Sequence, residues 1–191
     1  FASAQDGSLY EPAPDPNMSY VRVIDPGSDT ATVASQPLDE IGPGISAYVG
    51  VPAGEVPVLS DGIETTVTVE PATYYTVFST SDGTPTVAVD AITNSPAKAD
   101  LAFYNKTDIE GVELFVPQAN AAAVSDVAPW SSASVALNAP LVVDFELRGA
   151  GGEVLATLSG VSLKRKSGVS IVLTGNDGAY EAITSDNSVV Y

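Results

Sequence analysis

The side chains in this sequence that could do chemistry are mostly carboxylates, and two versatile catalytic side chains are missing. The 191-residue chain has 24 acidic residues, 7 lysines and arginines, and no histidine or cysteine. Without an imidazole, neither a Ser-His-Asp triad nor a histidine-ligated zinc site can form. Without a thiol there is no disulfide, thiolate metal site or cysteine nucleophile. We therefore expect no enzyme, no cofactor and no metal site.

Two carboxylate pairs deserve a test against simpler explanations. Asp25 and Asp29 flank a Pro-Gly-Ser segment and could supply oxygen ligands to calcium, but the full spacing of a calcium loop is absent. Asp144 and Glu146 fall on one face of a strand, and paired carboxylates 5–10 Å apart can hydrolyse glycosidic bonds. A solvated hairpin turn explains the first pair and a polar sheet face the second, and we favour both explanations.

The basic residues are unevenly placed, and one cluster is a candidate binding site. Lys164, Arg165 and Lys166 hold three of the seven bases of the chain. They could grip a carboxylated polymer or an acidic partner surface, or they could form a basic hairpin turn. Trp130 is the only tryptophan; it could anchor an interface or a sugar, although a core position is favoured. These four residues are the predicted polymer- or partner-binding set.

The net charge of −17 limits the classes of partner. Such a chain should repel nucleic acid and anionic membranes, and no apolar run is long enough to insert into a bilayer. Strong acidity also occurs in proteins from saline habitats, which is a simpler explanation of the charge. Residues 1–96 hold 13 acids and one base, Arg22, whereas residues 97–191 hold 11 acids and six bases. The two halves therefore offer partners different fields.

Short segments rich in β-branched and aromatic residues, separated by turn residues, predict an all-β fold of two tandem β-sandwich domains. The expected strands lie at 20–25, 45–50, 63–69, 74–80, 101–105, 111–116, 141–148, 154–158 and 169–174. A tight turn is expected at 51–54, where proline and glycine follow a strand. The predicted organisation is an N-terminal segment and linker at 1–19 and domains at 20–93 and 97–191.

The two predicted domains look like copies of one unit. Each opens with a strand that ends in a turn, and each later carries a β-rich segment followed by an aspartate-glycine turn, at Asp82-Gly83 and Asp177-Gly178. The spacing is longer in the second copy. We expect its extra length to be an insertion at Pro117 to Ala139, a polar and alanine-rich stretch that includes Trp130.

The first residues carry two signals. Ala2-Ser3-Ala4 has the small-residue pattern that signal peptidase accepts, so export to the periplasm is expected, with Gln5 as the mature N-terminus. Asp6-Gly7-Ser8-Leu9-Tyr10-Glu11-Pro12 follows, then a proline-containing spacer and the strand that begins Tyr20-Val21-Arg22-Val23.

This opening resembles that of the AlgF family, the periplasmic accessory proteins of alginate O-acetylation. The resemblance extends to the turn at Pro52-Ala53-Gly54, the pair Tyr74-Tyr75 and the strand Leu101 to Asn105. It implies a non-catalytic protein whose partners are separate SGNH-type O-acetyltransferases and, in addition, an anionic polysaccharide. The partner-binding residues expected on this basis are Asp6, Gly7, Leu9, Tyr10 and Arg22.

Two other readings stay open. The signature of Val21-Arg22-Val23 followed by Pro52-Ala53-Gly54 is also similar to repeat domains of secreted surface or adhesion proteins, which lack the opening at residues 6–12. A carbohydrate-binding module would instead expose aromatic side chains on one sheet face and bind sugar without a protein partner.

Overall fold

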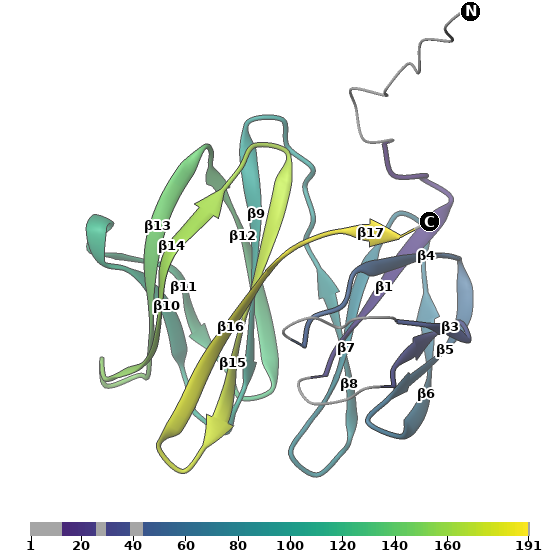
Figure 1. Ribbon diagram of the computed structural model, residues 1–191, viewed down its shortest axis with the longest axis horizontal. Coiled ribbons are helices and arrows are strands. Elements are labelled where there is room, and N and C mark those ends of the chain that lie inside the picture. Colours follow the sequence, from purple (N-terminus) through teal and green to yellow (C-terminus); the bar gives the residue numbers. More distant parts are fainter. Residues whose placement is uncertain (1–12, 26–29, 39–43, 191) are drawn as a thin grey trace, which may run out of the picture.

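A computed structural model describes residues 13–25, 30–38 and 44–190. Within these residues the chain is all-β, and the one helical element is the 3-10 turn η1 (Pro117–Ala119). The strands form four sheets that lie side by side as layers (Figure 1). On each side of the molecule, the outer sheet and the inner sheet next to it form one sandwich, so the predicted β-sandwich class is confirmed.

The first sandwich contains an inner first sheet and an outer first sheet. The inner first sheet has five strands in the order β17-β4-β1-β7-β8. The outer first sheet has four strands in the order β3-β2-β5-β6. Their bounds are β1 (Met18–Ile24), β2 (Thr32–Val33), β3 (Gln36–Pro37), β4 (Tyr48–Pro52), β5 (Gly54–Ser60), β6 (Ile63–Val69), β7 (Tyr74–Ser79), β8 (Pro85–Asp90) and β17 (Val189–Val190).

The second sandwich is built the same way from the following strands. Its inner second sheet has the order β12-β9-β15-β16, and its outer second sheet the order β11-β10-β13-β14. The bounds are β9 (Lys98–Lys106), β10 (Val112–Val116), β11 (Ala121–Val127), β12 (Ser131–Asn138), β13 (Leu141–Arg148), β14 (Val154–Leu163), β15 (Ser167–Asn176) and β16 (Ala179–Asp186).

The topology agrees with the repeat expected from the sequence. Each inner sheet is centred on a parallel pair, β1 with β7 and β9 with β15. Each pair is flanked by antiparallel neighbours, β4 and β8 in one sheet and β12 and β16 in the other. The two aspartate-glycine turns close the β7–β8 and β15–β16 hairpins, and Gly83, Asp177 and Gly178 have the positive φ angles that such turns require.

The stretch expected to be an insertion is instead two regular strands. β11 and β12 fill most of residues 117–139, and each adds an edge to a sheet of the second sandwich. Their sequences, AAAVSDV and SSASVALN, are rich in alanine and serine, which have weak strand propensity. Pairing with β10 and β9 overrides that weak preference, so the local pattern failed to reveal them.

Three of the four apolar clusters of the described residues stack along the molecule. One fills each sandwich, and a third lies between the two inner sheets, with Ile24 and Phe78 from one side packed against Tyr104 and Val172 from the other. The central strands of both inner sheets are therefore buried on both faces. This is why they read as nearly continuous apolar runs rather than as alternating ones.

The connections also join the two sandwiches. Asp100 is 5% exposed, and its carboxylate accepts hydrogen bonds from the backbone of Thr93 and Asn94 and from the Thr93 hydroxyl, which fixes the linker. After β16 the chain leaves the second sandwich, and β17 pairs in parallel with Tyr48 and Val49 of β4 (Figure 1). The last strand thus belongs to the first sheet.

Candidate functional site

The space between the two inner sheets holds two cations with very different surroundings. Arg22 lies on β1, where it alternates with Val21 and Val23. Because those valines face the core of the first sandwich, the arginine points the other way, toward the second sandwich. Lys106 ends β9 on the opposite sheet. The candidate site is therefore an interdomain one.

The Arg22 guanidinium donates four hydrogen bonds, and their acceptors lie on both inner sheets and on the segment before β17. Its Nε donates to Thr76 Oγ1 at 2.9 Å, and its Nη1 donates to Asn187 Oδ1 at 3.0 Å. Its Nη2 donates to Tyr104 OH and Ser170 Oγ, each at 2.7 Å. The four acceptors come from β7, β9, β15 and the segment before β17. One side chain thus ties the first sandwich to the second.

Asp90 balances this charge without touching it. Its carboxylate accepts hydrogen bonds from Tyr48 OH at 2.8 Å, from Thr76 Oγ1 at 2.5 Å and from Tyr104 OH. Thr76 and Tyr104 each accept a hydrogen bond from Arg22 and donate one to Asp90, so their hydroxyls bridge the two charged groups and relay the effect of each charge to the other. Within the described residues no buried side-chain nitrogen or oxygen lacks a hydrogen-bond partner.

The network shifts the titration of its members in the directions expected of buried charge. Burial alone lowers the pKa of Arg22, but Tyr104, Tyr48 and Asp90 outweigh it and the pKa is raised. Burial raises the pKa of Tyr48 well above its usual value, and it raises that of Tyr104 too. The tyrosines therefore stay neutral donors while the arginine stays charged.

The resemblance placed Arg22 among the expected partner-binding residues, and the structure places its side chain in the interior. Its side chain is 1% exposed, and all its hydrogen bonds are made within the chain. The guanidinium also lies 4.3 Å over the Tyr48 ring. Arg22 holds the interdomain interface together instead of presenting charge at the surface.

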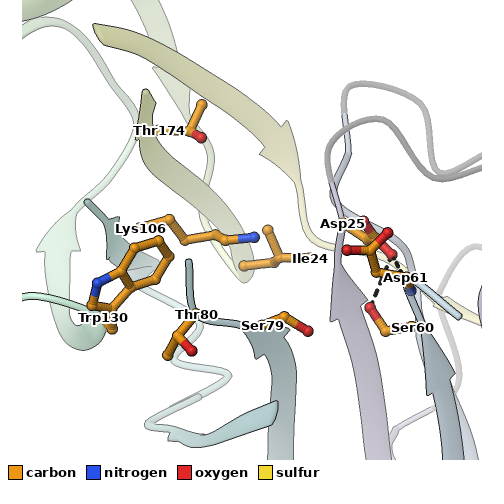
Figure 2. Close-up of a pocket in the computed structure, with 9 residues that line it drawn as sticks. All are labelled: Ile24, Asp25, Ser60, Asp61, Ser79, Thr80, Lys106, Trp130 and Thr174. Atoms are coloured by element: carbon orange, nitrogen blue, oxygen red, sulfur yellow. Dashed lines mark hydrogen bonds between the residues drawn. The ribbon is translucent and has the colours of Figure 1, made fainter. Parts of the chain in front are cut away.

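A pocket opens at one end of the same interface. It has a volume of about 200 Å³ and lies where the ends of β1, β7 and β9 come together with β15 and the β5–β6 turn (Figure 2). Its lining residues are Ile24, Asp25, Ser60, Asp61, Ser79, Thr80, Lys106, Trp130 and Thr174. Hydroxyl and charged groups therefore dominate the wall.

Lys106 extends across this pocket toward Ile24 and Asp25 (Figure 2). Among the residues the structure describes, its side chain makes no hydrogen bond or ion pair, and its Nζ lies 6.0 Å from the centre of the Phe78 ring. Burial lowers the pKa of Lys106, while Asp25 and Asp61 partly oppose this shift. The ammonium is free to donate to an oxygen of a ligand or partner that enters the pocket.

The carboxylates opposite Lys106 are positioned by local hydrogen bonds. Asp25 Oδ2 accepts from Ser60 Oγ and from the Asp61 backbone N–H, both at 2.9 Å, which fixes the β5–β6 turn (Figure 2). The rest of the suggested calcium loop, residues 26–29, lies outside the described residues. No group of three acidic residues in the described ranges is arranged to hold a metal ion.

Trp130 lies at the edge of the pocket. Its indole Nε1 donates to Asp108 Oδ1 at 2.8 Å, and the half-buried ring packs against the cluster between the inner sheets. The tryptophan thus fills a gap at the interface and still borders the open space. The position is compatible with both expectations from the sequence, a core residue and an anchor for a partner or a sugar.

The basic cluster is remote from this pocket. Lys166 has a positive φ, and Arg165 Nε donates to the Ala139 carbonyl, so the cluster forms the β14–β15 turn. It precedes Ser167, whereas the pocket residue Thr174 lies at the far end of the β15–β9 pairing. At about 3.3 Å per residue, the two ends are roughly 23 Å apart. The predicted set is therefore divided between two places.

The remaining sequence candidates are also placed. Asp144 accepts hydrogen bonds from Gln118 and Gly160, and Glu146 pairs with Arg148 at 2.5 Å, as on a polar sheet face. Asp6, Gly7, Leu9 and Tyr10 lie outside the described residues.

Sequence reasoning missed the residues that define the interface, above all Asp90, Tyr104, Asn187 and Lys106. A signal existed for the last of these. Lys106 directly follows the strand expected at 101–105, and it is one of only seven bases in the chain. A charge at such a strand end is a candidate for a site at a sheet edge.

The chain is similar to a family model, to a relative of known sequence and to a solved domain. The family described as "Alginate O-acetyl transferase AlgF" matches residues 1–170. The chain is 27% identical over 182 residues to the alginate biosynthesis protein AlgF of Pseudomonas aeruginosa, covering 93% of this chain and 82% of the relative. The solved C-terminal domain of AlgF from P. aeruginosa matches 48% of this chain and 99% of that domain, with 24% identity and a TM-score of 0.42. Across the described residues, no helix has the length and apolar character needed to cross a membrane.

Proposed function

This chain belongs to the AlgF family, and from that premise we propose that it is a non-catalytic accessory protein of alginate O-acetylation in the periplasm. On this proposal separate SGNH-type O-acetyltransferases carry out the acetyl transfer. This chain holds one or more of them in place. The family match supports the link to acetylation, and the absence of histidine from the whole sequence supports the division of labour.

The buried Arg22 network is the observation that carries the accessory role. Its hydrogen bonds join six strands of the two sandwiches and the segment before β17 within one buried interface. A scaffold needs its docking surfaces held in a fixed relation, and a fully bonded charged network supplies such rigidity. Here a network of that kind occupies the position where a two-domain enzyme often has its cleft.

The charge of the surface favours a protein partner over the polymer. Alginate is a polyanion, and the net charge of −17 opposes its approach. The pocket holds one cation, Lys106, opposite Asp25 and Asp61. The turn at Lys164 to Lys166 is the part of the described structure best suited to a polymer contact. We therefore rank direct polymer binding second.

A pull-down tests the two candidates against each other. Tagged full-length chain is expressed in its native host, recovered from periplasmic and membrane fractions, and its companions are identified by mass spectrometry. Enrichment of SGNH-type O-acetyltransferases is the expected result. Recovery of polymer or cell-wall material without an acetyltransferase would overturn the accessory role and favour a secreted binding module. Charge reversal at Lys164 to Lys166 then asks whether that turn is needed for acetylation.

A further inference from the structure

Strand β8 is an unpaired edge of the inner first sheet. Within the described residues it is hydrogen-bonded to β7 alone. Thr80 N–H donates to the Thr84 carbonyl at the start of this hairpin. Since antiparallel bonding alternates, Val87 and Val89 direct their backbone N–H and C=O groups to the free side. Val87 and Val89 thus offer a partner strand a ready row of donors and acceptors.

The side chains of this edge are apolar and uncovered. Val87 is 43% exposed and Val89 is 65% exposed. They stand opposite Val77 and Tyr75 of β7, which are both part of the core of the first sandwich. Val87 and Val89 therefore face the inside of the sandwich, yet the outer first sheet leaves them open.

The opening is a notch between the edge strands of the two sheets. Ile63, at the start of β6, is 38% exposed, and its Cδ1 approaches the Gly83 turn so closely that a Cβ there would lie 3.3 Å away. The strands thus touch near the hairpin turn. Packed sheets are rotated by about 30° relative to each other, so their edge strands diverge. The high exposure of Val89 shows that the outer first sheet no longer covers β8 at its other end.

The charge around this notch defines what can enter it. Asp82 lies in the hairpin turn at one end of the notch, and Glu70 follows β6 at the other. The only base in residues 1–96 is Arg22, which is buried. No exposed cation of this half opposes a basic visitor, whereas a second copy of this acidic chain would be repelled.

We propose that the notch formed by Ile63, Val87 and Val89 is a docking site for an extended segment of a partner protein. The segment pairs with β8 as a sixth strand of the inner first sheet and inserts alternate apolar side chains over the valines. Lysine or arginine residues at its ends face the flanking carboxylates. This inference rests on the proposed function, because it takes the partner to be an SGNH-type O-acetyltransferase.

The second sandwich supplies a matched control. Val142, on β13, is 65% exposed, the same fraction as Val89, and Val154, on β14, is 50% exposed. Val142 pairs with Ser162 of β14, whereas β10 pairs only with Glu146 to Arg148 at the other end of β13. Lysine at Val142 therefore changes the charge and the exposed apolar area as much as lysine at Val89, but it does so in the other sandwich and not on β8.

The experiment uses the full chain and one purified SGNH-type O-acetyltransferase of the same host. Affinity is measured by calorimetry for the unmodified chain, Val89→Lys, Val89→Thr and Val142→Lys, after thermal melts confirm that each variant folds. We expect Val89→Lys to weaken binding by at least about tenfold and Val142→Lys by less than about twofold. Val89→Thr, which keeps strand propensity, should lie between them. Hydrogen exchange should show the Val87 and Val89 amides protected by the bound enzyme.

Each outcome has one meaning. Unchanged affinity of Val89→Lys, or amides of β8 that stay unprotected in the complex, overturns the docking site and leaves the accessory role intact. Failure of the unmodified chain to bind any SGNH-type acetyltransferase overturns the proposed function, and the docking site with it. A chain that dimerises alone, and does so no longer as Val89→Lys, assigns the notch to a second copy and also overturns the proposal.

Discussion

Two cations lie between the same two sheets, and they differ in almost every other respect. Arg22 is 1% exposed and makes four hydrogen bonds to both sandwiches. Lys106 is partly buried beside a pocket and, among the described residues, its side chain has no hydrogen bond or ion pair. Burial contributes to lowering both pKa values, but neighbouring groups reverse the shift for Arg22 only.

The difference shows how one interface can be sealed at its centre and open at its end. A guanidinium has five donors in a fixed plane, so it can be satisfied by acceptors from several strands. An ammonium on a flexible stem is harder to hold in a fixed set of hydrogen bonds, and it loses its proton more readily when it is buried. The arginine therefore suits the joint between the sandwiches, and the lysine suits a place where something else binds.

The largest effect is expected from removing the arginine. Arg22→Met removes four hydrogen bonds and leaves the Asp90 carboxylate buried without its countercharge. Breaking a buried charge pair on one side costs roughly 3–5 kcal/mol. Urea unfolding of the full chain measures this loss. A cost below about 1 kcal/mol would mean that the network is not what joins the sandwiches.

The next effect is expected from the hydroxyl that relays the two charges. Tyr104→Phe removes one of the two acceptors of Arg22 Nη2 and one of the three hydroxyl donors to Asp90 together. A hydrogen bond to a charged group contributes roughly 1.5–3 kcal/mol, so a loss of about 2 kcal/mol is expected. Tyr180→Phe is the control, because this tyrosine packs at the second sandwich. Equal losses in the two variants would contradict the relay.

Lys106→Met should cost nothing and should raise stability at neutral pH by no more than about 1 kcal/mol, given its partial exposure. Burial lowers the pKa of Lys106 in the folded chain, so the unfolded chain holds the proton more tightly. The charged lysine then costs stability below its folded pKa, and this cost vanishes above the unfolded value of about 10.4. Melting curves of both proteins between pH 7 and pH 11 should converge as the pH rises. Destabilisation by methionine at pH 7 would show that Lys106 has a partner in the fold.

The smallest effect is expected at a charged group outside the interface. Hydrogen bonds from Thr80 and Thr84 lower the pKa of Asp82 to about 2. A lowered folded pKa means that the stabilisation is present above the unfolded value of about 3.9 and is lost as the pH falls toward 2. Asp82→Asn should lower the melting temperature slightly at pH 6 and not at all near pH 2. A constant difference at both pH values would assign the effect to the turn rather than to the charge.

Much of the fold followed from the sequence, because the local signals agreed with the tertiary structure. The β-rich segments before Asp82-Gly83 and Asp177-Gly178 became the equivalent hairpins of two related sheets. The alanine- and serine-rich β11 and β12 were missed, since their strand state comes from pairing and not from their own preference.

The site was less predictable, and Arg22 shows why. The alternation of Val21, Arg22 and Val23 correctly places the arginine on the face away from the first core. In a single sandwich that face meets water, and a surface role follows. Only the packing of a second sandwich against it makes the face internal. Local sequence carries no record of which sheet covers which.

The return of the chain end to the first sheet sets an order of events for a protein that emerges N-terminus first. β4 cannot gain its outer neighbour, and Arg22 cannot gain Asn187, until the final residues are available. Until then the first sheet has four strands and the guanidinium lacks one acceptor. The joint is therefore complete only when residues 187–190 are present, and a chain cut before residue 187 carries a defect in its first sandwich, far from the cut in sequence.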